Sequence, residues 1–123
     1  MNKVNESAKQ LADTIVEGIQ EKKGTNIAIL DLSKLDNTIC QYFIICEGDS
    51  TTQVDAIAEG VSDYVRQQLN DRPIHVEGRE NALWILLDYF DVVVHVFHKD
   101  QRDFYNLEGL WADAVRTNIE NLF

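Results

Sequence analysis

Apolar residues recur every three or four positions in two stretches of the chain, with charged and amide side chains between them. This spacing places the apolar residues on one side of a helix and predicts two amphipathic helices. We expect the first helix to end at Gly24 as a left-handed cap, and the second to start after Ser50, which with Gln53 has the spacing of a capping box. The apolar positions are Val4, Ala8, Leu11, Ala12, Ile15 and Ile19 in the first helix, and Val54, Ile57, Ala58, Val61, Tyr64, Val65 and Leu69 in the second.

Short runs rich in β-branched and aromatic residues predict strands at residues 27–32, 39–46, 74–76, 82–87 and 92–97. A polar turn over residues 33–37 separates the first two strands, and Pro73 marks the turn into the third. The last two strands flank residues 88–91 and are predicted to form an antiparallel hairpin. From residue 103 to residue 123 the apolar spacing is mostly helical, which predicts a short helix followed by a C-terminal helix.

This order of elements predicts one α/β (α+β) domain over residues 1–123, with a mixed β-sheet and flanking helices. On the predicted hairpin, Trp84 and Leu86 share one side of the strand while Ile85 and Leu87 share the other. The hairpin is therefore apolar on both sides. Either helices cover both faces of the sheet, or one face is a surface for a partner.

The net charge narrows the choice of partner. The chain has 11 Lys and Arg against 21 Asp and Glu, a formal charge of −10, and each half of the sequence carries −5. Proteins that bind nucleic acid need a basic surface, so we expect little or no direct nucleic-acid binding and a basic protein partner. Without an apolar run of about 20 residues or a targeting signal, we expect a cytoplasmic protein with no membrane segment.

The two cysteines lie six positions apart in one predicted strand run. On a strand, Cys40 and Cys46 would share one face about 20 Å apart, too far for a disulfide bond. This spacing favours two buried thiols.

Candidate catalytic groups are few. Asp31, Asp88 and Asp91 lie near predicted strand ends and could form a divalent metal site, although Asp88 and Asp91 also bracket a turn. His95 and His98 are three positions apart, so a strand points them to opposite faces. A small metal-dependent nucleotidyl or phosphoryl transferase using the three aspartates stays open as the alternative function, but we predict no catalytic, cofactor-binding or metal-binding residue.

Seven of the eleven aromatic residues fall between residues 84 and 111, and aromatic side chains commonly anchor protein interfaces. Residues 84–97, with the sequence WILLDYFDVVVHVF, and residues 102–114, with the sequence RDFYNLEGLWADA, resemble the signature of the ribosomal silencing factor (Iojap) family. Residues 31–32, 44–46 and 48–58 also fit the family, so the resemblance covers most of the chain.

The resemblance implies a translation repressor that is not an enzyme. Such a protein binds the large ribosomal subunit through ribosomal protein L-fourteen and blocks association with the small subunit, lowering translation under nutrient limitation or in stationary phase. The implied fold is related to nucleotidyltransferases but lacks their catalytic site. The sequence leaves open whether the chain is a monomer or a homodimer. The implied contact residues for L-fourteen are Trp84, Asp88, Tyr89, Asp91, His95, Arg102, Tyr105, Leu107, Glu108 and Trp111.

The chain departs from the family pattern at two places. Many relatives have Arg-His where this chain has Thr52-Gln53, and a glycine where it has Phe90. Because Thr52-Gln53 replaces Arg-His, we do not assign to the start of the second helix the polar role that Arg-His would have there. Because an aromatic residue replaces glycine, we predict that the turn between Asp88 and Asp91 does not require a positive φ.

Overall fold

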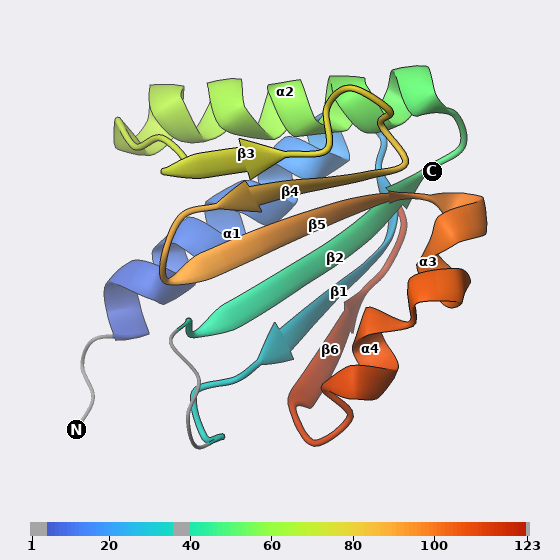
Figure 1. Cartoon of the computed structure of the whole chain (residues 1–123). Coiled ribbons are helices and arrows are strands. Elements are labelled where there is room, and N and C mark those ends of the chain that lie inside the picture. Colours follow the sequence, from blue (N-terminus) through green and yellow to red (C-terminus); the bar gives the residue numbers. More distant parts are fainter. Residues whose placement is uncertain (1–4, 36–39, 123) are drawn as a thin grey trace.

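The computed structural model describes residues 5–35 and 40–122, which form a mixed β-sheet with helices on both faces (Figure 1). The predicted turn over residues 33–37 lies partly outside the described residues. The helices are α1 (Asn5–Glu21), α2 (Thr51–Leu69), α3 (Lys99–Tyr105) and α4 (Leu107–Leu110). The strands are β1 (Thr25–Asp31), β2 (Tyr42–Gly48), β3 (His75–Glu77), β4 (Trp84–Asp88), β5 (Val92–His98) and β6 (Val115–Ile119).

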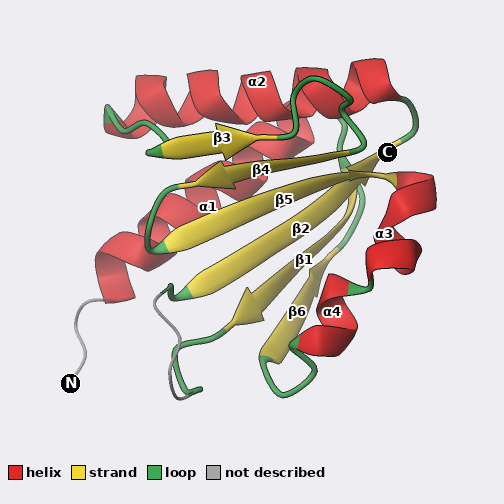
Figure 2. Ribbon diagram, in the orientation of Figure 1, coloured by secondary structure: helices red, strands yellow, loops and turns green. Residues whose placement is uncertain are grey.

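The strands lie in the order β3-β4-β5-β2-β1-β6 (Figure 2). Strands β2 and β5 are parallel, whereas the other neighbouring strands are antiparallel. The parallel pair arises because α2 carries the chain from the end of β2 back across the sheet, and the hairpin β4–β5 then returns beside β2. The predicted mixed sheet and the predicted hairpin are both confirmed.

Helix α1 ends in a Schellman motif, in which the N–H groups of the two residues after the cap bond back to carbonyls of the last turn. The Gly24 N–H donates to the Ile19 carbonyl at 3.0 Å and the Lys23 N–H to the Gln20 carbonyl at 3.0 Å. The prediction of a left-handed Gly24 is wrong, because the residue with positive φ is Lys23, at 64°. Gly24 instead provides space, since a Cβ there would lie 2.5 Å from Ile19 Cγ2.

Helix α2 begins at the predicted cap. Ser50 Oγ accepts a hydrogen bond from the Gln53 N–H at 3.1 Å. The Gln53 side chain reaches one residue further back than a capping box requires, and its Oε1 accepts from the Asp49 N–H at 2.7 Å. The Ser50 cap is therefore confirmed, while the Gln53 side chain bonds the N–H of the residue before the cap and not that of Ser50 itself.

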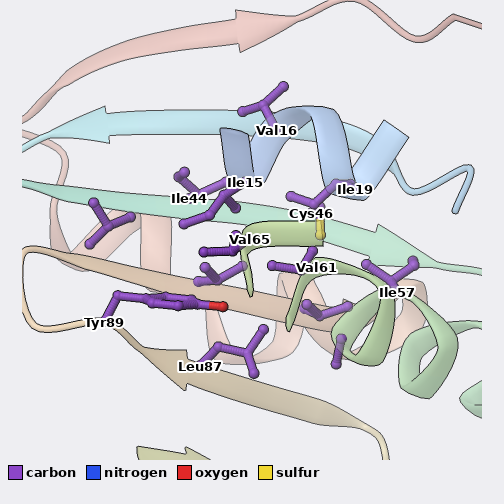
Figure 3. Packing of buried hydrophobic residues seen from close by; sticks show 14 of the residues in the cluster. Ile15, Val16, Ile19, Ile44, Cys46, Ile57, Val61, Val65, Leu87 and Tyr89 are labelled. Carbon is purple, nitrogen blue, oxygen red and sulfur yellow. The ribbon is translucent and has the colours of Figure 1, made fainter. Parts of the chain in front are cut away.

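Helices α1 and α2 cover one face of the sheet and form the larger core with it (Figure 3). Ile15 and Ile19 of α1 pack with Ile57 and Val61 of α2 against the apolar side of β2, β4 and β5, all fully buried. Tyr89 belongs to this core, and its ring lies near Val65 and Leu87 in Figure 3. We call this side of the sheet the helix-covered face.

The two thiols lie in different cores, contrary to the prediction that they share one face. Cys46, on β2, packs in the helix-covered core, whereas Cys40 precedes β2 and packs with Ile45 and Phe97 in a second core on the other face. The strand alternation that the prediction assumed does not hold because β2 begins only at Tyr42. Both cysteines are buried thiols, and burial raises the pKa of Cys40 to about 11 and of Cys46 to about 12.

The predicted C-terminal helix is wrong. The chain forms α3 and the one-turn α4, and then residues 115–119 form β6, which pairs with β1 at the edge of the sheet. The apolar residues Ala114, Val115 and Ile119 keep the helix-like spacing, but the sequence VRTNI also has the β-branched residues typical of a strand, and its pairing with β1 makes it one.

The prediction for the turn of the hairpin is also wrong, because Phe90 has a φ of 76°. The Asp91 N–H donates to the Tyr89 carbonyl at 3.0 Å, which closes a three-residue γ-turn with Phe90 at its centre. The Phe90 N–H donates to Asp88 Oδ1 at 2.8 Å, so the aspartate side chain helps to hold the turn. The exposed Phe90 ring does not offset this backbone strain by packing in either core.

We expect Phe90→Gly to stabilise the fold. A positive φ costs a non-glycine residue about 1–2 kcal/mol, which the glycine would remove. Glycine also gives the unfolded chain more conformational freedom, which lowers stability by about 0.4–1 kcal/mol. The free energy of unfolding, measured with urea, should therefore rise by about 0.5–1 kcal/mol. Phe90→Ala is the control, because it removes the ring and keeps the strain. An equal gain from alanine would show that the ring, and not the backbone, is responsible.

Candidate functional site

The face of the sheet opposite α1 and α2 is only partly covered, by α3 and α4 (Figure 1). We call it the open face. Side chains alternate between the two faces along each strand, and the strand register aligns β2, β4 and β5 so that their alternating positions match. These three strands contribute mainly apolar and aromatic side chains to the open face. Its residues are Phe43 and Ile45 on β2, Trp84 and Leu86 on β4, and Val93, His95 and Phe97 on β5.

Aromatic rings from four elements meet on the open face. The Trp84 ring stacks on Phe97 with centroids 4.9 Å apart and contacts Tyr105, from the end of α3, at 4.7 Å. On the other side, Phe43 meets the Trp111 ring edge to face at 5.6 Å. The side chains that follow β5 therefore close over the middle of the open face. Ring pairs in this geometry add about 0.5–1.5 kcal/mol each beyond the area they bury.

His95 lies at the centre of this aromatic cluster and is buried. The Trp84 Nε1–H donates to His95 Nδ1 at 3.1 Å, so a neutral imidazole carries its proton on Nε2. His95 Nε2 has no hydrogen-bond partner among the described residues. Burial lowers the pKa of His95 to about 4, because removing the ring from water disfavours its charged form.

Arg102 attaches α3 to the sheet and to α4 through four hydrogen bonds to three residues. Its Nη1 donates to the Asn26 carbonyl on β1 and to Glu47 Oε1 on β2, the latter at 3.1 Å. Its Nε and Nη2 donate to the two oxygens of Glu108 on α4, at 3.2 and 2.8 Å. Arg116 on β6 reaches the same Glu108 carboxylate at 2.9 Å. Hydrogen bonds from Arg102 hold the pKa of Glu108 below its usual range.

Beyond the aromatic cluster, α3 and α4 present apolar side chains to solvent. Phe104 is 77% exposed, Leu110 76% and Tyr105 43%. Asp100 and Asp103 are exposed on the same short helix α3. Exposed aromatic and aliphatic groups with acidic neighbours have the chemistry of a surface that binds a basic protein.

The structure brings together most of the residues that the family signature indicated. Tyr89 does not join them, because it lies in the helix-covered core, where burial raises the pKa of its hydroxyl above its usual range. Asp88 and Asp91 lie at the hairpin turn, where Asp88 accepts from the Phe90 N–H and the Asp91 carbonyl accepts from the Gln41 and Tyr42 N–H groups. The residues that gather on the open face, α3 and α4 are Trp84, His95, Arg102, Tyr105, Leu107, Glu108 and Trp111.

Sequence reasoning missed Phe43 and Glu47, which contact His95 and Arg102 respectively. Both lie on β2, and their place in the site depends on the parallel pairing of β2 with β5. The alternation along β2 predicts from the sequence that Phe43, Ile45 and Glu47 share one face. The sequence does not predict which residues of β5 lie beside them, because that depends on the register of the parallel pair.

The aspartates of the alternative transferase function make separate local contacts. Asp31 Oδ1 accepts from the Ser33 N–H and hydroxyl at 2.9 and 2.6 Å, while Asp88 caps the Phe90 N–H. Within residues 5–35 and 40–122, no three His, Cys, Asp or Glu side chains are grouped so that they could hold a metal ion. In the same ranges, no helix has the length and apolar character needed to cross a membrane.

Comparison with known proteins adds independent information. A family model described as ribosomal silencing factor during starvation matches residues 5–122. The chain is 40% identical over 116 residues to the ribosomal silencing factor RsfS of Halalkalibacterium halodurans, covering 94% of this chain and 97% of that protein. It is 35% identical over 104 residues to the chloroplastic protein Iojap of Zea mays, covering 85% of this chain and 44% of that protein.

Solved structures show the same fold. A crystal structure of a protein from Chromobacterium violaceum superposes with a TM-score of 0.79 at 36% identity, covering 85% of both chains. Another from Bacillus halodurans gives a TM-score of 0.75 at 37% identity, covering 91% of this chain and 98% of that one.

We expect Arg102→Met to destabilise the protein by about 3 kcal/mol, because removing one partner of a buried ion pair leaves the other charge uncompensated. Urea unfolding followed by tryptophan fluorescence measures this loss. Arg79→Met is the matched control, since Arg79 pairs with Asp55 at 2.9 Å but both side chains are exposed. That pair should contribute less than about 1 kcal/mol. Similar losses in the two variants would contradict the role assigned to Arg102.

The buried His95 predicts a dependence of stability on pH. Its pKa is about 4 in the folded protein and about 6.5 when unfolded, so between these values the unfolded chain binds the extra proton and stability falls as pH falls. From pH 7.5 to pH 5.0 the contribution of this group is a loss of about 2 kcal/mol. In His95→Gln the urea midpoint should change less over this interval, with other titrating groups common to both proteins. An identical pH dependence in the variant would refute the assignment.

Proposed function

Because the chain belongs to the ribosomal silencing factor family, we propose that it represses translation by binding the large ribosomal subunit through its open face and through α3 and α4. The observation that carries this proposal is the incomplete cover of the open face. The large side chains Phe104, Tyr105 and Leu110 stand exposed beside the aromatic cluster. A chain that buries its other core so completely leaves such a surface where a partner takes the place of solvent.

The charge of the chain supports a ribosomal protein as the direct partner. A net charge of −10 repels the phosphates of ribosomal RNA, whereas it attracts a basic protein surface. Among such partners the family resemblance implies ribosomal protein L-fourteen, which we propose as the partner, with the cytoplasm as the place of action. Asp88 and Asp91, at the hairpin turn, are proposed to meet basic side chains at the rim of this contact.

We propose that the protein acts by occlusion and without a chemical step. A domain bound where the small subunit must dock prevents subunit joining by excluded volume alone. In this proposal Trp84, Tyr105 and Trp111 contact the partner together with the exposed Phe104 and Leu110. His95, Leu107, Arg102 and Glu108 hold the aromatic residues in position. Tyr89 supports the hairpin turn from the helix-covered side.

The test is reassociation of separated small and large subunits, followed by sedimentation. At saturating protein, the fraction of joined subunits should fall. Tyr105→Ala should weaken binding to the large subunit by about tenfold or more, because truncating a central interface aromatic commonly costs over about 1–2 kcal/mol. Binding to isolated L-fourteen should weaken in parallel.

Ile74→Ala is the matched control, because Ile74 is an exposed apolar residue that precedes β3, outside α3 and α4. It should bind as the unmodified protein does, and circular dichroism should show both variants folded. Subunits that join normally at saturating protein would refute occlusion. Equal binding by Tyr105→Ala and the unmodified protein would refute the proposed surface.

A further inference from the structure

A small cavity lies on the open face where β3 ends, beside the aromatic cluster. Its volume is about 190 Å³, and it is lined by Glu77 and Gly78 at the end of β3 and by Trp84 and Leu86 on β4. The cavity therefore combines an aromatic wall, an aliphatic wall and one carboxylate. These are the groups that receive a long cationic side chain, whose stem is apolar and whose tip is charged.

The register between β3 and β4 explains why this place is empty. Glu77 lies opposite Leu86, which is an open-face residue, so Glu77 points to the open face as well. If the same antiparallel pairing continued for two more residues, Arg79 would lie opposite Trp84 and point to the open face. The pairing stops at Glu77, and no arginine reaches that position.

Gly78 turns the chain away before Arg79 can pair with Trp84. It has a φ of 91°, and a Cβ on it would clash with the Trp84 carbonyl, so only glycine suits this position. After the turn the chain rises to α2 (Figure 2), where Arg79 Nε and Nη2 donate to Asp55 Oδ1 at 3.1 and 2.9 Å. The arginine that the register would place on the open face is therefore bound on the helix-covered side.

The Trp84 ring leaves one of its sides to the cavity. Phe97, which lies opposite Trp84 on β5, stacks on the ring with centroids 4.9 Å apart. Strand β3 lies on the other side of β4, and it is towards β3 that Trp84 lines the cavity. A cation held against an aromatic ring is attracted by the negative face of the ring, and this attraction increases when water is excluded.

Glu77 supplies a carboxylate that can pair with such a cation. Its Oε2 contacts His75 Nε2 at 2.6 Å, whereas its Oε1 has no partner among the described residues. The Glu77 side chain is 65% exposed, so a group arriving from solvent can reach Oε1. No lysine or arginine of the described chain lines the cavity, and the net charge of −10 attracts cations to this surface.

We propose that the cavity receives one arginine side chain of the basic protein that binds the open face. The guanidinium lies against Trp84 and pairs with Glu77, in the place that the register leaves open, and its aliphatic stem packs on Leu86. Arginine suits this cavity better than lysine, because a flat guanidinium stacks on an aromatic ring. This inference rests on the proposed function, and it names the side chain that the partner must supply.

Binding of the full chain to isolated L-fourteen tests the proposal through the charge at residue 77. Glu77→Lys should raise the dissociation constant at least about tenfold, because a like charge then faces the guanidinium. Glu80→Lys is the matched control, since Glu80 is also exposed but does not line the cavity. The control should raise the dissociation constant less than about threefold, through long-range attraction alone. Equal losses in the two variants would overturn the proposal.

A small probe tests the cavity in the absence of any ribosomal component. N-acetyl-arginine amide is titrated into the unmodified full chain at constant ionic strength, and the indole N–H signals are followed by NMR. The chain has two tryptophans, and Trp111→Phe assigns their signals. The Trp84 signal should shift progressively over about the millimolar range. N-acetyl-citrulline amide, which has nearly the same shape without the charge, should shift it far less.

The probe also separates this proposal from the proposed function. Equal shifts from the arginine and citrulline probes, or no shift of the Trp84 signal, would overturn arginine recognition whatever protein the chain binds. An arginine response that Glu77→Gln removes and Glu80→Gln retains would support it. If that response is present but L-fourteen does not bind, or the subunits join normally, the proposed function fails and arginine recognition stands.

Discussion

One buried guanidinium fixes the position of the whole segment that follows β5. Arg102 is the only buried residue of α3, and α4 has none, so these short helices cannot hold themselves by burying an apolar side. A buried charge is costly unless its donors find partners, and four of the five N–H donors of Arg102 bond to Glu47, Glu108 and the Asn26 carbonyl. Because these partners belong to three different elements, the ion pairs specify geometry as well as contributing energy. Tyr105 and Trp111 take their places over the open face as a result.

The two faces of the sheet are consequently held by different forces. The helix-covered face is a core of mainly aliphatic side chains from α1, α2 and four strands, and its stability scales with the apolar area that it buries. The open face is held by aromatic contacts and by the charges around Arg102. A surface built in this way can remain apolar and partly exposed without loss of the fold, because the other face supplies the larger core. The larger core on the helix-covered face explains how the fold can tolerate the exposed apolar side chains Phe104, Tyr105 and Leu110 on α3 and α4.

The sequence predicted those parts of the structure that depend on local pattern. Helical periodicity located α1 and α2, and the Ser50 cap and the β4–β5 hairpin were predicted correctly. Strand β6 was missed because its pairing with β1 depends on residues far away in the sequence, while the preceding residues have helical spacing. Phe90 and Lys23 show the same limit at single positions, since surrounding hydrogen bonds impose a positive φ on residues that disfavour it. In the site, the family resemblance indicated Trp84 and Tyr105, but the partners Phe43 and Glu47 required the parallel register of β2 with β5.

The pairing of β1 with β6 also determines when the sheet can be completed. Ile27 pairs with Ile119, so β1 emerges early in synthesis and stays without one of its two neighbours until almost all the described chain has been made. Contacts between residues so distant in sequence form late and slowly, because a long loop must close first. The ion pair between Arg116 and Glu108 also forms only after β6 has been synthesised, because Arg116 lies on β6. A partly synthesised chain can form most of the helix-covered core. The β1–β6 edge of its sheet cannot form until β6 has left the ribosome.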